Sequence, residues 1–124
     1  MRIATHICRI VLGIAFTVFG LNGFLQFLPQ GPTPTGLAGQ FFTVFMASHY
    51  YVPVFAVQLV CGILFLVNRY VPLALTMIAP VIVNILIFHI LMNPGGIGPG
   101  IVVTVLWMVV ARSVRGAFAG ILQK

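Results

Sequence analysis

The chain contains no aspartate and no glutamate, and its six lysine and arginine residues lie near the two ends and at position 69, with long uncharged stretches between these places. Of its 124 residues, 61% are hydrophobic and only 5% are charged, whereas soluble domains carry about 25% charged residues. A soluble protein of this size could not cover its surface with so few charges, but a protein surrounded by lipid has no such need. The composition therefore predicts one integral membrane domain over residues 1–124.

The missing carboxylates also exclude several kinds of function. No carboxylate pair is available for acid–base catalysis, and no carboxylate can hold magnesium, calcium or a di-iron centre. No nucleophile–base pair is visible either, so we expect no catalytic residue, no metal site and no enzyme acting alone. The cations form no patch with interleaved aromatic residues, which argues against nucleic acid and favours anionic lipid headgroups as partners.

Long apolar stretches, separated by two segments rich in proline and glycine, predict the membrane-spanning helices. The two breaks are PQGPTPTG at 29–36 and NPGGIGPG at 93–100, because these residues end helices. A helix needs about 20 apolar residues to cross a hydrocarbon core of about 30 Å. The expected spans are 7–28, 52–67, 71–92 and 99–111. The first stretch could also be a signal peptide, but its length and the lack of an obvious cleavage site favour a retained helix.

The segment LAGQFFTVFMASHYY at 37–51 allows two interpretations. A helix over this segment places five residues along one side, namely Leu37, Phe41, Val44, Phe45 and Ser48. This pattern favours an amphipathic helix that lies in the lipid–water interface on the outer side of the membrane, anchored by Tyr50 and Tyr51. The same residues also suit the first turns of the span at 52–67.

The positions of the cations predict the orientation of the chain. The turn at 68–70 is so short that the second and third spans must be antiparallel neighbours. With four spans, this turn and both termini lie on one side of the membrane, and these regions contain all six cations: Arg2, Arg9, Arg69, Arg112, Arg115 and Lys124. Because cytoplasmic loops collect Lys and Arg, we expect an all-α four-helix bundle with both termini in the cytoplasm and an interfacial helix in the first outer loop.

A few polar side chains interrupt the apolar spans at similar predicted depths. At a rise of about 1.5 Å per residue, Gln58 lies near the midplane, and Asn22 and Asn84 lie in the outer half. An amide facing lipid would leave its hydrogen bonds unmade, at a cost of several kcal/mol. The amides therefore either join helices by hydrogen bonds or line a small polar pocket for the head group of a ligand.

Two histidines lie near the outer ends of their segments, His89 in the third span and His49 in the segment at 37–51. Neutral imidazoles there could ligate haem or contact a quinone carbonyl, and hydrogen bonding at the interface is the simpler interpretation. We expect no resident cofactor. The candidate ligand-binding residues are Asn22, Gln58, Asn84 and His89.

Gly13 and Gly20 lie seven residues apart on one face of the first span, with Thr17 between them. Small residues allow helix backbones to approach closely in membranes. This face is therefore the expected packing seam of the first span.

Two segments resemble the DoxX-like family of small four-span bacterial membrane proteins. They are LGIAFTVFGLNGFLQFLP at 12–29 and LVCGILFLVNRYVPLALTMIAPVIVNILIFHILMNPGG at 59–96. The resemblance implies a four-helix bundle in the bacterial inner membrane. The family is named after a subunit associated with a terminal quinol oxidase, and relatives are linked to thiosulfate:quinone oxidoreductases, so it also implies a link to electron transport. Members often carry an acidic residue in the second span, whereas this chain has Gln58 in that region.

Three functions follow from these features. The favoured prediction is a non-catalytic accessory or structural subunit of a larger respiratory or photosynthetic membrane complex, with other membrane subunits as partners. A quinone- or lipid-handling protein that uses the polar pocket is the first alternative. An oligomeric transporter of small solutes is the second, although no charged group inside the membrane is available to couple an ion.

Overall fold

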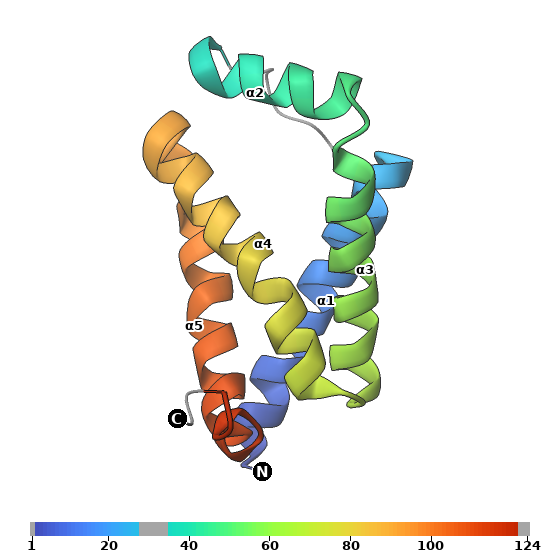
Figure 1. Cartoon of the computed structure of the whole chain (residues 1–124), viewed down its shortest axis with the longest axis vertical. Helices are drawn as coiled ribbons and strands as arrows, with labels where there is room; N and C mark the ends of the chain where they lie inside the picture. Colours follow the sequence, from blue (N-terminus) through green and yellow to red (C-terminus); the bar gives the residue numbers. More distant parts are fainter. Residues whose placement is uncertain (1, 28–34, 122–124) are drawn as a thin grey trace.

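The computed structural model describes residues 2–27 and 35–121, and the regular elements over these ranges are all helices (Figure 1). The α-helices are α1 (Ile3–Leu25), α2 (Gly36–Ala47), α3 (Tyr51–Val67), α4 (Val71–Met92) and α5 (Gly98–Ser113), and the short 3₁₀ helices are η1 (Pro94–Gly96) and η2 (Arg115–Phe118). The predicted all-α class is confirmed.

Four of the helices touch in a closed order: α1 contacts α3, α3 contacts α4, α4 contacts α5, and α5 contacts α1. Figure 1 shows α1 and α3 as one pair and α4 and α5 as another. The two pairs meet near the end that holds both termini and diverge toward the opposite end, where α2 lies across the gap. The three residues between α3 and α4 make the expected tight antiparallel turn, with Asn68 and Tyr70 in the left-handed conformation.

The lengths of the helices limit which of them can cross a membrane. By length and composition α1 and α4 qualify singly, and α5 is a shorter apolar helix. The pair α2 and α3 qualifies only as one broken segment, bent by 86°. Two or three helices could therefore span a membrane. Because of this bend α2 is a separate helix, so the segment at 37–51 does not continue α3 in a straight line.

The ends of the predicted spans differ slightly from the helices. The first span was expected over 7–28, but α1 begins at Ile3 and ends at Leu25. Gln26 stops it by adopting a left-handed conformation in which its N–H bonds to the Asn22 carbonyl. Residue 28 and most of the break at 29–36 lie outside the described residues. The helices α3, α4 and α5 begin and end within two residues of the spans expected at 52–67, 71–92 and 99–111.

The contact between α1 and α3 depends on glycines. A Cβ atom added to Gly62 would lie 2.5 Å from the backbone N of Thr17, and one added to Gly20 would lie 2.7 Å from the backbone N of Leu59. A Cβ atom on Gly13 would come within 3.0 Å of the Gly62 carbonyl. The seam predicted at Gly13 and Gly20 is therefore confirmed, and α3 contributes Gly62 from the opposite side.

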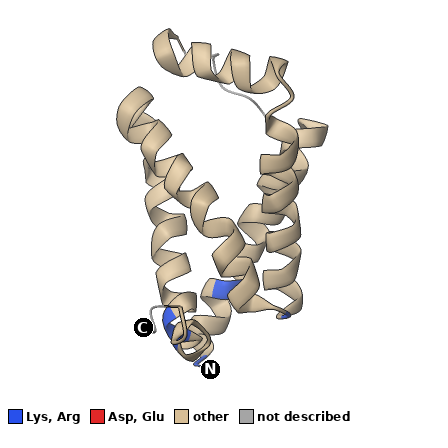
Figure 2. Ribbon diagram, in the orientation of Figure 1, with Lys and Arg blue, Asp and Glu red and all other residues tan. Residues whose placement is uncertain are grey.

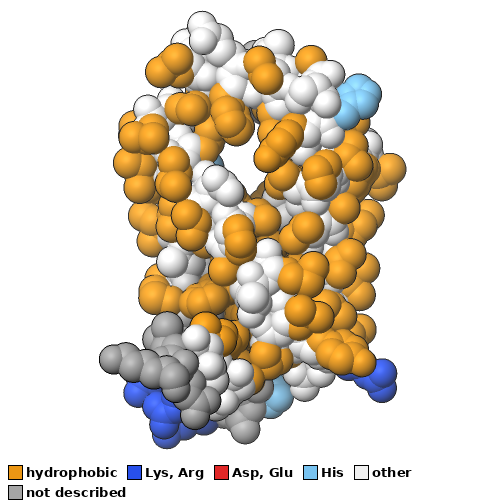
Figure 3. All heavy atoms as spheres, viewed as in Figure 1, with side chains coloured by type: hydrophobic (Ala, Val, Ile, Leu, Met, Phe, Trp, Pro, Cys, Tyr) orange, Lys and Arg blue, Asp and Glu red, His pale blue; other side chains and the backbone are white. Residues whose placement is uncertain are grey.

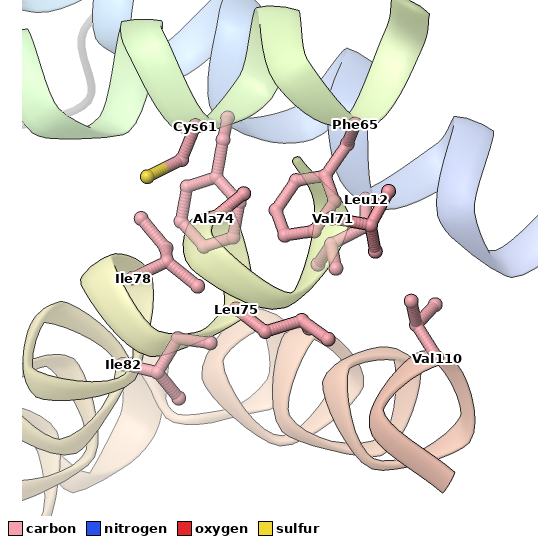
Figure 4. Close-up of a cluster of buried hydrophobic side chains, with 10 residues drawn as sticks. Leu12, Cys61, Phe65, Val71, Ala74, Leu75, Ile78, Ile82 and Val110 are labelled. Carbon is pink, nitrogen blue, oxygen red and sulfur yellow. The ribbon is translucent and has the colours of Figure 1, made fainter. Parts of the chain in front are cut away.

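A cluster of buried side chains joins all four contacting helices near the end with the termini (Figure 4). It comprises Leu12, Phe16, Cys61, Phe65, Val71, Ala74, Leu75, Ile78, Ile82 and Val110. A hydrogen bond also joins α5 to α4 here, because the Trp107 Nε1–H donates to the Leu75 carbonyl at 3.0 Å. This end of the molecule is thus closed by packed side chains.

Arg9 is buried, with 7% of its surface exposed, in a chain that has no carboxylate to pair with it. Its Nη1 donates to the Phe65 carbonyl and, at 3.5 Å, to the Leu66 carbonyl. The last carbonyls of a helix lack intrahelical partners and carry partial negative charge. The carbonyls at the end of α3 therefore take the place of a carboxylate as the partner of Arg9. This contact was not predicted from the sequence.

The arginines of the described residues gather at one end of the molecule (Figure 2). Two lie at or near the start of α1, one in the turn between α3 and α4, one in the last turn of α5 and one in η2: Arg2, Arg9, Arg69, Arg112 and Arg115. Lys124 lies outside the described residues. The end covered by α2 has no cation among the residues that the structure describes.

The substitution Gly62→Ala tests the seam. The added methyl group must displace α1 or α3, so we expect a loss of about 1–3 kcal/mol in the free energy of unfolding, measured by reversible unfolding in mixed micelles. Gly98→Ala is the matched control, because a Cβ atom there meets nothing within 4 Å and should change stability by less than about 1 kcal/mol. Equal stabilities of the two variants would contradict the close approach of α1 and α3.

Candidate ligand-binding cavity

A cavity of about 760 Å³ lies between the two helix pairs and beneath α2. Figure 3 shows the molecule hollowed at this level. All five α-helices contribute to its walls, which are mostly aliphatic and aromatic. Sites for small molecules in proteins have volumes of about 300–1,000 Å³ and are largely apolar with a few polar groups. The cavity therefore has the size and lining of a ligand-binding site.

The cavity arises because α3 and α4 separate as they leave their common turn. Near the turn Phe65 and Leu75 are fully buried in the packed cluster. Farther along the same helices, Phe55 on α3 and Ile85 on α4 line the cavity instead. Each helix thus runs from the core into a cavity wall, so the packing at the turn decides where the cavity begins.

Aromatic side chains hold α2 over the cavity. The rings of Phe41 on α2 and Phe88 on α4 lie 5.1 Å apart, and those of Phe45 on α2 and Phe55 on α3 lie 5.9 Å apart. Such pairs contribute about 0.5–1.5 kcal/mol beyond burial. Four of the five residues predicted to share one side of this segment line the cavity: Phe41, Val44, Phe45 and Ser48. This side of α2 therefore faces the cavity.

Gln58 is the buried polar residue of the cavity wall. Its side chain is 6% exposed, and it lines the cavity from α3. Among the described residues its amide has no hydrogen-bond partner. The fully buried side-chain atoms without a partner in the described ranges are Arg9 Nε and Thr17 Oγ1, so the Gln58 amide keeps some accessible surface. A polar atom placed in the cavity beside Gln58 could therefore bond to this amide.

Asn84 and His89 line the same cavity from α4. The Asn84 Nδ2 donates to the Pro80 carbonyl at 2.9 Å, and the His89 Nδ1 lies 2.7 Å from the Ile85 carbonyl oxygen. Both bonds stay within α4. Asn84 therefore does not use this bond to join α4 to another helix, and its amide oxygen and second N–H stay available to a ligand.

Two polar residues considered from the sequence are not part of the lining. Asn22 lies in the last turn of α1 and is not among the lining residues. His49 lies at the bend between α2 and α3, where its ring faces Tyr51 at 6.0 Å. Gln58, Asn84 and His89 thus come together, while Asn22 and His49 stay outside. No group of three or more His, Cys, Asp or Glu residues that could hold a metal ion occurs in the described ranges.

The aromatic contacts that hold α2 over the cavity are the part of the site that the sequence analysis missed. The sequence analysis placed Phe41 and Phe45 on one side of an interfacial helix and named no partner for them, whereas they contact Phe88 and Phe55 across the cavity. The spacing of four residues between Phe41 and Phe45 was a usable signal, since it places both rings on one helix face. Nothing local to the sequence pointed to their partners on α3 and α4.

Comparison of the chain with protein-family models, with curated proteins and with solved structures gives no match. The resemblance to DoxX-like proteins therefore stays a prediction, and the function must be argued from the cavity itself.

Proposed function

We propose that this chain is a multi-pass membrane protein that binds a small apolar molecule with a polar end, which is the quinone- or lipid-handling function. The observation that carries the proposal is the cavity of about 760 Å³, whose wall contains the buried Gln58 with no hydrogen-bond partner for its amide among the described residues. A subunit with a purely structural role needs neither an open cavity nor an unbonded amide. An accessory role in a redox complex of a bacterial inner membrane stays a separate prediction.

The proposed arrangement in the membrane has four spans, formed by α1, α3, α4 and α5, with both termini in the cytoplasm. The closed order of contacts among these helices supports it, as does the gathering of the described arginines at one end. The 17 residues of α3 are within the range of membrane spans, and the 16 of α5 are just below it. In this arrangement α2 lies at the outer interface and the cavity lies in the outer half of the bilayer.

A molecule from the bilayer suits this cavity better than one from water. The only polar side chains among its described lining residues are Ser48, Tyr50, Gln58, Asn84 and His89, and none of them is Lys, Arg, Asp or Glu. A charged solute would lose its hydration without gaining an ionic partner. An apolar molecule with one hydrogen-bonding end loses little hydration when it enters the cavity, and its polar end can bond to the Gln58 amide.

Cysteine labelling tests the orientation. In intact cells or spheroplasts, a membrane-impermeant maleimide should react with the variant Gly95→Cys at the outer end and spare Arg69→Cys until the membrane is permeabilised. Both positions are exposed, so the difference reports the side of the membrane. The unmodified chain, which has Cys8 and Cys61, measures background labelling. Labelling of Arg69→Cys but not Gly95→Cys in intact cells would contradict the proposed orientation.

Ligand binding in nanodiscs tests the function. We offer a short-tailed quinone and a diacylglycerol separately, and we expect at least one to bind. The substitution Gln58→Leu should weaken that binding about 10-fold, which corresponds to about 1.4 kcal/mol. The fold should stay intact, since replacing an unpartnered buried amide by an apolar side chain is neutral or stabilising.

Gln40→Leu is the matched control, because Gln40 is exposed on α2 and is not among the lining residues. Its affinity should equal that of the unmodified chain. The proposal fails if neither compound binds, or if the two glutamine substitutions have equal effects.

A further inference from the structure

The hydrogen bond of the His89 ring determines which of its nitrogens carries the proton. Nδ1 lies 2.7 Å from the carbonyl oxygen of Ile85. A carbonyl oxygen only accepts hydrogen bonds, so the proton of the neutral ring is on Nδ1. Nε2 then holds a lone pair and can only accept.

The Nε2 edge of the His89 ring lies beside Gly96. Both residues line the cavity, and a Cβ atom added to Gly96 would lie 3.3 Å from Nε2, 3.1 Å from Cδ2 and 3.2 Å from the Nδ2 of Asn93. A larger residue at position 96 would therefore crowd this edge. Among the described residues no group donates a hydrogen bond to Nε2, so this nitrogen can accept a hydrogen bond from a ligand.

The other polar groups of the wall do not discriminate between ligands in the same way. The amides of Gln58 and Asn84 each contain a donor and an acceptor, so they can bond to either a carbonyl or a hydroxyl group. A neutral His89 with its proton committed to Ile85 can bond only to a donor. The expectation that a neutral histidine contacts a quinone carbonyl therefore does not suit His89.

We infer that the cavity selects an apolar molecule whose polar end is a hydroxyl group, and that His89 is the residue that sets this preference. The inference rests on the proposed function and names the ligand class of the same site. Two sources of this chemistry exist in a membrane, a reduced quinone and a lipid with a free hydroxyl group. Haem iron could also bind the lone pair, but the described lining residues offer no cation for the haem propionates.

A matched pair of probes tests the inference directly. A long-chain alkylphenol and its methyl ether differ only in the O–H donor, and each is titrated into the protein in nanodiscs. We expect the phenol to bind about 10-fold more tightly than the ether. The substitution His89→Phe should abolish this difference, and binding of the ether to the variant shows that the cavity is intact. His89→Gln, which keeps an acceptor in the side chain, should restore part of the preference.

Equal binding of phenol and ether to the unmodified chain would overturn the inference and leave the proposed function standing. Binding of neither probe would overturn both. Competition against the bound phenol then identifies which membrane molecule supplies the hydroxyl group. Displacement by a quinol points to a reduced quinone, and displacement by a diacylglycerol points to a lipid. Displacement by the oxidised quinone as effective as that by the quinol would also overturn the preference for a hydroxyl group.

Discussion

The close packing of α1 against α3 is the contact on which the rest of the molecule depends. Because Gly62 has no side chain, the two helix backbones approach so closely beside Thr17 that a Cβ atom would not fit. Arg9 secures the end of this contact by donating to the last carbonyls of α3. Because α3 carries Gln58, the α1–α3 pair forms one wall of the cavity. The turn at the end of α3 also sets where α4, which forms the opposite wall, begins.

A chain without carboxylates must satisfy the polar side chains of its helices in other ways, and here it uses backbone carbonyls. Arg9 bonds to the end of α3, Asn84 to the Pro80 carbonyl and Trp107 to the Leu75 carbonyl. Gln58 is buried without such a bond in the part of the chain that the structure describes. The Nε of Arg9 and the Oγ1 of Thr17 are also buried without a partner, but of these three residues only Gln58 lines the cavity. Buried polar groups are almost always bonded, so Gln58 is the place where we propose that a ligand supplies the missing bond.

The features that were predictable from the sequence are local or periodic. Long apolar runs and the Pro/Gly breaks predicted the helices, and the spacing of Gly13 and Gly20 predicted the seam. The features that were missed depend on where distant segments meet. The depth of Asn22 along its helix could be estimated, but not its direction around the helix, so its place outside the cavity was not predictable. The burial of Arg9 likewise depends on where α3 ends beside α1.

An experimental structure of the chain in lipid nanodiscs or a lipidic mesophase tests the cavity most directly. We expect α3 and α4 to diverge beyond their turn, with α2 across the gap and density for an elongated molecule whose polar end lies within hydrogen-bonding distance of the Gln58 amide. A structure in which α4 closes against α3, leaves no cavity and bonds Gln58 to a neighbouring helix would contradict the proposed function.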